Sequence, residues 1–170
     1  QVPEGLAYSL PALKQLSEAT SQDLFVSEAI RRLGPLVQQA ELLSAQYDTV
    51  VANPPYLGGK GLNAELKSYL KQDYADVKSD LFSAFTVRCS ALGSSRARIG
   101  IMSPNVWMYL SAHEKLRSFL SSRRTLTSLV ELPLSGFKGA TVQICSFTFS
   151  NAHLPQLKSS CIRLVNFKGG

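Results

Sequence analysis

The 170-residue sequence has a formal net charge of +6, with 45 % hydrophobic and 18 % charged residues. This composition is typical of a globular protein with a hydrophobic core and excludes an intrinsically disordered chain. No apolar run approaches the roughly 20 residues that span a bilayer, and the first residues lack the basic and apolar regions of a secretory signal. We therefore expect a cytoplasmic protein that does not enter a membrane.

The first 46 residues form a segment of their own. Apolar residues recur at spacings near three and four, which predicts helices. Gly34-Pro35 is expected to break the pattern, because proline lacks an amide and disfavours helix in its predecessor. We predict two or three short helices over residues 1–46 and find no recognisable chemistry there.

The pattern changes at residue 47, and residues 47–170 read as a second unit. Residues 47–52 are a β-branched apolar run, which predicts a strand of a parallel sheet that is covered on both faces. Strands then alternate with helices, which indicates an α/β fold, and the two closing strands fit an antiparallel pair. The expected strands are residues 47–52, 98–103, 125–131, 142–149 and 162–167. The expected helices are residues 64–71, after a cap at Asn63, about 80–92, with Asp80 as its cap, and 106–120.

Charge and cysteines give weaker indications. Residues 1–44 hold three basic and five acidic side chains, whereas residues 45–170 hold fifteen basic and seven acidic ones. Such an excess of positive charge suits a polyanion partner, although many proteins that never bind nucleic acid share it. Cys89, Cys145 and Cys161 have no CxxC spacing, which argues against a disulfide framework and a zinc site. His113 and His153 are isolated, so we expect structural histidines and no metal.

The sequence Asn53-Pro54-Pro55-Tyr56 directly follows the first expected strand. Ligands of open α/β sheets bind outside the carboxyl ends of the strands, so this position suits an active site. The Asn53 side-chain oxygen and the Pro54 carbonyl can each accept a hydrogen bond from an –NH2 group, which would orient its nitrogen toward an electrophilic methyl. The prolines make the turn rigid, and Tyr56 offers an aromatic face for a planar base. The alternative is a plain strand-ending turn, since Asn-Pro is a common turn opener.

An apolar strand that ends in NPPY resembles the catalytic motif of amino-group methyltransferases, above all the adenine-specific DNA enzymes. The resemblance covers roughly residues 45–150. Within it, the stretch from residue 53 to residue 108 resembles the type IIG restriction-modification and BREX phage-defence adenine methyltransferases, whose signatures appear here in order. They are the segment 53–63, the lysine and DLF helix at residues 78–85, and the strand and tryptophan at residues 99–107.

The resemblance implies roles for several residues. Asn53, Pro54, Pro55 and Tyr56 would form the catalytic motif that acts on N6 of adenine in double-stranded DNA. Tyr56 and Phe137 would stack on the two sides of the flipped base. Asn53 and Phe82 would contact S-adenosylmethionine, although Phe82 also fits a core aromatic, and Lys60 would contact a DNA phosphate.

The implied fold is the C-terminal half of a class I, Rossmann-like, S-adenosylmethionine-dependent methyltransferase sheet, preceded by the helical segment. The glycine-rich cofactor loop typical of the family does not precede Asn53. We therefore expect an inactive fragment of a longer enzyme that lacks the cofactor loop and the target-recognition domain. Its strand at residues 47–52 would have an open edge, through which the chain is expected to self-associate.

Three other functions remain open from the sequence. NPPY is also typical of methyltransferases that modify glutamine in release factors, because a glutamine amide presents the same –NH2 geometry as adenine. Methylation of adenine in RNA is a close variant. A non-catalytic module that binds DNA or a partner in a defence complex is the third alternative, and the missing cofactor loop favours it for this chain.

Overall fold

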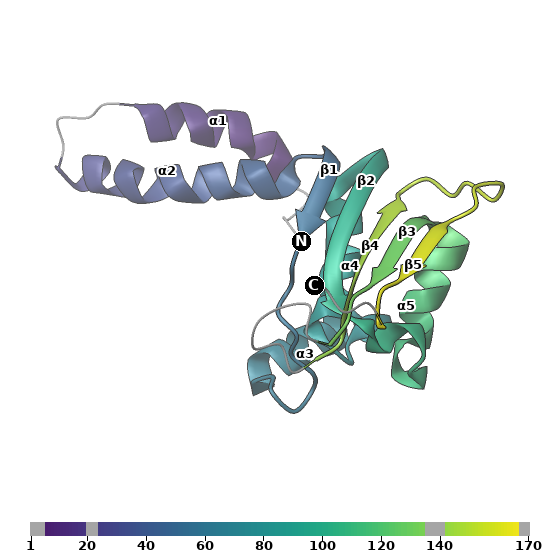
Figure 1. Cartoon of the computed structure of the whole chain (residues 1–170). Helices are drawn as coiled ribbons and strands as arrows, with labels where there is room; N and C mark the ends of the chain where they lie inside the picture. Colours follow the sequence, from purple (N-terminus) through teal and green to yellow (C-terminus); the bar gives the residue numbers. More distant parts are fainter. Residues whose placement is uncertain (1–5, 20–23, 135–141, 167–170) are drawn as a thin grey trace. The chain divides into compact units, whose positions relative to one another are not determined.

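The computed structural model describes residues 6–19, 24–134 and 142–166 of the chain. It divides into two compact units, Gln1–Gln46 and Tyr47–Gly170. Figure 1 labels the helices and strands of both units. The first unit is helical, and the second contains a five-stranded sheet.

The first unit consists of two helices, α1 (Leu6–Glu18) and α2 (Leu24–Ser44). Lys14 of α1 and Glu41 of α2 form an ion pair, with 3.2 Å between Nζ and Oε1. The break predicted at Pro35 is wrong, because α2 continues through this proline and is 21 residues long. A proline removes one hydrogen bond of a helix, and a helix of this length keeps many others. None of the helices in the described part of the chain has a stretch that could span a bilayer.

The second unit is built on a mixed sheet with the strand order β1-β2-β4-β3-β5. β1 is parallel to β2, β4 is antiparallel to both β2 and β3, and β5 is parallel to β3. Figure 1 shows the strands in this order. They are β1 (Tyr47–Ala52), β2 (Gly93–Pro104), β3 (Thr125–Glu131), β4 (Ile144–Ser150) and β5 (Ser160–Arg163).

The predicted pairing of the two closing strands is wrong. β4 lies between β2 and β3, and β5 pairs with β3 rather than with β4. Burial explains the arrangement. Phe147 and Phe149 of β4 are fully buried, which suits a central strand, whereas every residue of β5 is exposed, which suits a sheet edge.

The helices that follow β1 begin at predicted caps. α3 (Ala64–Asp73) starts after Asn63, whose Oδ1 accepts a 2.8 Å hydrogen bond from the amide of Leu66. A short turn, η1 (Ala75–Val77), leads to α4 (Leu81–Leu92). Here Oδ1 of Asp80 accepts from the amide of Phe82 at 3.3 Å. Each cap satisfies an amide that has no partner inside its helix.

The single helix predicted over residues 106–120 is wrong, because the segment folds into four short pieces. Nη1 of Arg117 donates to the carbonyl oxygens of Trp107 and Leu110, each at 2.7 Å. The indole Nε1 of Trp107 donates to Sγ of Cys145 at 3.3 Å. These tertiary bonds replace the regular helical ladder. The pieces are η2 (Asn105–Met108), η3 (Ser111–His113), α5 (Glu114–Ser118) and the π-helix η4 (Phe119–Arg123).

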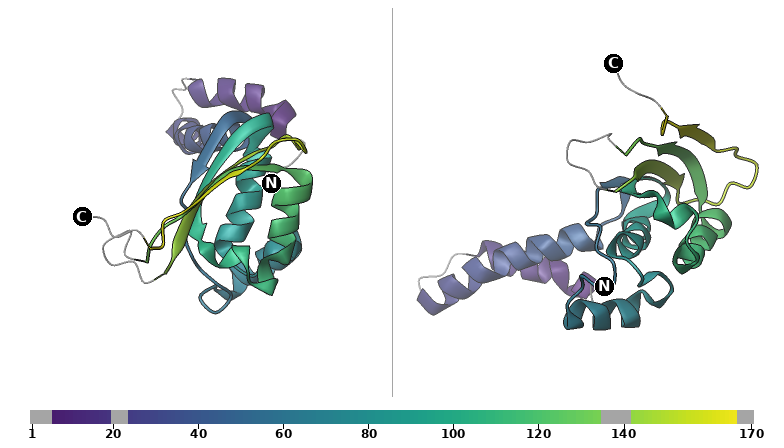
Figure 2. Two further views of the ribbon diagram at one scale, coloured as in Figure 1. Left: turned by 45° about the vertical axis from the view of Figure 1, so that its right-hand side comes forward. Right: turned by 60° about the horizontal axis from the view of Figure 1, so that its bottom comes forward.

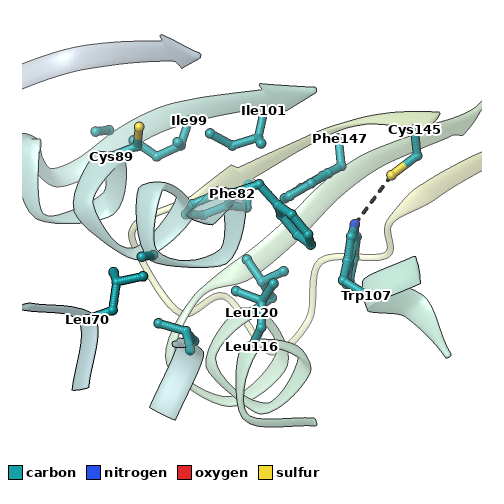
Figure 3. Packing of buried hydrophobic residues seen from close by; sticks show 14 of the residues in the cluster. Leu70, Phe82, Cys89, Ile99, Ile101, Trp107, Leu116, Leu120, Cys145 and Phe147 are labelled. Carbon is teal, nitrogen blue, oxygen red and sulfur yellow. Dashed lines mark hydrogen bonds between the residues drawn. The ribbon is translucent and has the colours of Figure 1, made fainter. Parts of the chain in front are cut away.

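The hydrophobic core lies between one face of the sheet and the helices α4 and α5. Figures 1 and 2 show these helices on the same side of the strands. Figure 3 shows Phe82 of α4 among the core side chains of β2 and β4. The side chains of Phe82, Ile99 and Phe147 are completely buried. Burying a side chain of this kind contributes about 1.5–3 kcal/mol to folding.

β1 is less covered than its apolar sequence predicted. Val50 and Ala52 pack against the core, but Val51 on the opposite face is 78 % exposed. Val51 lies over Gly100, where a Cβ would be 3.7 Å from the valine Cγ2. The prediction of a strand covered on both faces is therefore wrong for this chain. Among the described residues, β1 pairs with β2 along one edge, and its other edge is open.

Candidate active site

The carboxyl ends of β1, β2 and β3 lie along one edge of the sheet, because these three strands run in the same direction. β1 ends at Ala52 and leads into the turn at residues 53–56, which we call the NPPY turn. β2 ends at Pro104 and β3 at Glu131. The topology therefore places the predicted catalytic residues at the edge where open α/β sheets bind ligands.

Within the NPPY turn, Asn53 is exposed. The hydroxyl of Tyr56 donates a 2.9 Å hydrogen bond to Oδ1 of Asn53. In this arrangement the carboxamide oxygen accepts from the tyrosine, and its second lone pair is left for another donor. Pro54 is buried and Pro55 is exposed, so one proline anchors the turn and the other faces solvent.

Tyr56 lies half inside this edge and is 37 % exposed. Burial and the nearby Cys145 thiol raise the pKa of the Tyr56 phenol, so the hydroxyl remains protonated and able to donate at neutral pH. Cys145 itself is completely buried, opposite Ser103 of β2 and Glu131 of β3. Burial raises the pKa of this thiol, against the hydrogen bonds from Trp107 and Ser103, and keeps it neutral. Figure 3 shows the Trp107–Cys145 hydrogen bond.

The segment that follows Tyr56 is attached to the start of α4. The amide of Leu57 donates to Oδ1 of Asp80 at 3.3 Å, and the amide of Leu81 donates to the carbonyl of Leu57 at 3.1 Å. Gly58 and Asp80 form an isolated antiparallel bridge. Burial raises the pKa of the Asp80 carboxyl, and the amides of Phe82 and Leu57 oppose this shift. Asp80 is therefore both a helix cap and a contact of the segment that follows the NPPY turn.

Phe82, the candidate cofactor contact, is completely buried and does not face solvent. Its ring lies 5.2 Å from that of His113, at 38°. His113 is also buried, and its Nδ1 lies 3.1 Å from Oγ of Ser83. Burial lowers the pKa of His113, Asp80 opposes this effect, and Arg117 adds to it. The structure thus places Phe82 in the core against His113, two residues after the Asp80 cap of α4.

The other predicted site residues are not brought together here. Lys60 is exposed in the loop between the NPPY turn and α3, and no ion pair in the described part of the chain involves it. Phe137 falls outside the described residues. Two clefts flank α3, one of about 450 Å³ beside η1 and η4 and one of about 200 Å³ against α4. Neither cleft is lined by residues of the NPPY turn.

A polar cluster at the same sheet edge escaped the sequence analysis. Oε1 of Glu131 accepts from Nδ2 of Asn105 at 2.9 Å and from Nε2 of Gln143 at 3.2 Å. Its Oε2 lies 3.0 Å from Nε of Arg163, and the Tyr109 hydroxyl donates to Oδ1 of Asn105 at 3.2 Å. One signal was present in the sequence. Asn105 follows a strand and a proline, a pattern close to that of Asn53, and it too lies at the carboxyl end of a strand.

The described residues contain no cluster of His, Cys, Asp or Glu that could bind a metal ion. All three cysteines are free; Cys89 and Cys145 are buried, whereas Cys161 is exposed. The NPPY turn itself offers oriented hydrogen-bond acceptors and an aromatic face. That chemistry suits the capture of an –NH2 group.

Comparisons with known proteins show the family of the chain. Residues 12–137 match the Eco57I restriction-modification methylase family. The chain is 36 % identical over 171 residues to the adenine-specific methyltransferase BrxX of Escherichia coli O9:H4 (strain HS). This alignment covers 98 % of this chain and 14 % of BrxX. It is 30 % identical over 135 residues to the adenine-specific methyltransferase PglX of Lacticaseibacillus casei (strain Zhang), with 78 % of this chain and 11 % of PglX covered. The chain thus spans a small part of the length of these relatives.

Solved structures show the same fold. A Listeria monocytogenes protein, described as a class I S-adenosylmethionine-dependent methyltransferase, has a TM-score of 0.59 at 13 % identity over 94 % of this chain and 55 % of its own. DrdV in complex with DNA has a TM-score of 0.59 at 9 % identity over 79 % of this chain and 16 % of its own. The predicted class I methyltransferase fold is therefore confirmed. On its sequence, its sheet and its NPPY turn, the chain belongs to the Eco57I restriction-modification methylase family.

Proposed function

We propose that this chain carries the amino-group site of an enzyme that transfers a methyl group from S-adenosylmethionine to N6 of adenine in double-stranded DNA, in restriction-modification or phage defence. One observation carries the proposal. The Asn53 carboxamide is exposed on a diproline turn at the carboxyl edge of the sheet, beside the ring of Tyr56. The names of the relatives BrxX and PglX, both adenine-specific methyltransferases, support adenine as the substrate.

The residues of the turn suit the reaction. Oδ1 of Asn53 and the carbonyl of Pro54 would each accept one hydrogen of the exocyclic amine. Two such bonds favour a pyramidal nitrogen whose lone pair is free to attack, so the site supplies orientation and needs no strong base. Tyr56 would stack on one side of the flipped adenine, and we assign the other side to Phe137.

S-adenosylmethionine fits the residues present only in part. When bound, it would supply an electrophilic methyl group. Asn53 is exposed and able to face it, whereas Phe82 is buried in the core, so a contact with Phe82 remains a proposal. The longer protein would provide the rest of the cofactor site, and this chain alone would be inactive.

Duplex DNA is the proposed partner of the full-length protein. The structural likeness to DrdV bound to DNA is a likeness of fold, and it supports this proposal together with the excess of basic residues after residue 44. Lys60 is exposed beside the NPPY turn, where its ammonium group would reach a phosphate near the flipped base.

The experiment uses the full-length parent protein with labelled S-adenosylmethionine and three substrates: duplex DNA, RNA, and a release-factor protein. We expect label in DNA adenine. The Asn53→Ala variant should lose at least 100-fold in rate, because both orientation and a transition-state hydrogen bond are removed. Its stability should barely change, since the side chain is exposed. Asn166→Ala, the same change in an exposed turn, is the control and should keep its activity.

Each other outcome is decisive. Label that appears only in the release factor would show that the substrate is glutamine and not adenine. Label that appears only in RNA would show that the adenine is in RNA and not in DNA. Full activity of Asn53→Ala would remove the proposed role of the turn. DNA binding without label in any substrate would favour a binding module.

A further inference from the structure

The two prolines of the NPPY turn remove two backbone donors that could fix the position of its far end. Pro54 and Pro55 have no amide hydrogen, and proline fixes φ but not ψ. The turn is held at its start by β1, which pairs with β2 up to Ala52. The amides able to hold its end are therefore those of Tyr56 and Leu57. In the structure it is the Leu57 amide that binds a side chain, Oδ1 of Asp80.

Asp80 reaches Leu57 from 23 residues further along the chain. The same oxygen accepts from the Phe82 amide, so one carboxylate oxygen joins the start of α4 to the end of the NPPY turn. The Leu81 amide completes the attachment by donating to the Leu57 carbonyl at 3.1 Å. Both polar groups of the Leu57 backbone are thus bound to residues 80 and 81.

A simple helix cap does not need this arrangement. Ser, Thr, Asn or Asp at an exposed position caps a helix without binding a distant loop, as Asn63 does for α3. Asp80 is instead partly buried, and burial raises the pKa of its carboxyl. Burying a carboxylate costs free energy unless several donors compensate. The amides of Leu57 and Phe82 and the charge interaction with His113 each lower the pKa of Asp80 and so offset part of this cost, while burial remains the larger effect.

We propose that Asp80 is a positioning residue of the methyl-transfer site: its carboxylate fixes Leu57, and through Leu57 it sets the position of the Asn53–Tyr56 turn relative to α4. The proposal rests on the proposed function of that turn. Asp80 itself does not touch the substrate amine. Its role is to keep the acceptors of Asn53 and Pro54 in the position that the reaction needs. A misplacement of about 1 Å at such a site can cost about 100-fold in rate.

The test compares Asp80→Ala, which removes the acceptor, with Asp80→Asn, which keeps an oxygen at the same place. Amide hydrogen exchange of the full-length protein is followed in the peptide that covers residues 54–61. We expect about tenfold faster exchange there in Asp80→Ala, as fits the loss of a charge-assisted hydrogen bond, and near wild-type exchange in Asp80→Asn. Asn63→Ala is the matched control. It removes the cap of the neighbouring helix and should leave residues 54–61 unchanged.

Methyl transfer provides the second readout. Asp80→Ala should lower kcat by about 10- to 100-fold with a smaller change in KM for DNA, and Asp80→Asn should restore most of kcat. Unchanged exchange at residues 54–61 in Asp80→Ala would overturn the proposal, as would an asparagine variant that is as impaired as the alanine variant. If the wild-type protein methylates none of the substrates, the proposed function fails, whereas the exchange data still test the attachment by themselves.

Discussion

The hydroxyl of Tyr56 binds Oδ1 of Asn53 at 2.9 Å, so the aromatic residue of the NPPY turn contacts the same oxygen that would accept the substrate amine. A carbonyl oxygen has two acceptor positions, and the hydroxyl uses one of them. The contact orients the carboxamide with its oxygen toward the tyrosine. It also means that Tyr56 has two separable parts, a ring that would stack and a hydroxyl that orients.

These two parts predict different effects of substitution at Tyr56. Tyr56→Phe keeps the ring, so we expect methyl transfer in the full-length protein to fall by no more than about threefold. Tyr56→Ala removes stacking worth about 1–3 kcal/mol per base, so binding of the flipped base should weaken by about 10- to 100-fold. The measurement is the fluorescence of duplex DNA with 2-aminopurine at the target position, together with the methylation rate. An equal loss of base binding and of methylation rate in both variants would show that the hydroxyl, and not stacking of the ring, is what the site needs from Tyr56.

His113 predicts a pH dependence of stability. Its pKa is lowered in the fold, chiefly by burial, from an ordinary value of 6.5. As the pH falls below about 6.5, the unfolded chain takes up the proton first, so the free energy of unfolding decreases until the folded histidine is protonated as well. His113→Gln should flatten this decrease. Urea unfolding at pH 7.5 and pH 5 measures it, with the exposed His153→Gln as the control; an equal decrease in all three proteins would contradict the prediction.

Phe82 has two candidate roles, packing in the core and contact with S-adenosylmethionine, and a substitution can separate them. The residue is fully buried, so Phe82→Leu should lower the free energy of unfolding by about 1–2 kcal/mol through lost packing. If Phe82 only packs, KM for S-adenosylmethionine should stay within about twofold of wild type, which is the outcome that its burial favours. An increase of tenfold or more, at a temperature where the variant is fully folded, would assign it to the cofactor site. Leu120→Ala, an equally buried change in η4, controls for the loss of stability alone.

Local patterns predicted most of the elements and the position of the NPPY turn at the end of β1. The bounds of β1 and β3 were correct, and the caps at Asn63 and Asp80 were recognisable because their side chains bind amides only two or three residues away. NPPY was visible because its chemistry is contained in four consecutive residues. Each of these features depends on neighbours in the sequence.

The features that were missed depend on distant residues. Trp107 leaves the expected helix because it bonds to Cys145, 38 positions further on. The position of β4 between β2 and β3 follows from the burial of its phenylalanines against α4. Asp80 appeared in the sequence as a cap, and its contact with Leu57 spans 23 positions. Such contacts leave no periodicity for the sequence to reveal.

The open edge of β1 leads to the last prediction, which concerns the 170-residue chain on its own. Val51 is 78 % exposed on a strand that pairs along one edge within the described residues. Exposed apolar edge strands pair with other chains, so the isolated chain should self-associate as its concentration rises. Val51→Lys should shift the chain toward monomer, because a charge on an edge strand opposes pairing and the exposed site costs little in folding. Leu154→Lys places the same charge in an exposed turn and should leave association unchanged. Sedimentation velocity over a concentration series measures both variants, and a wild-type chain that stays monomeric throughout would remove the role of the β1 edge.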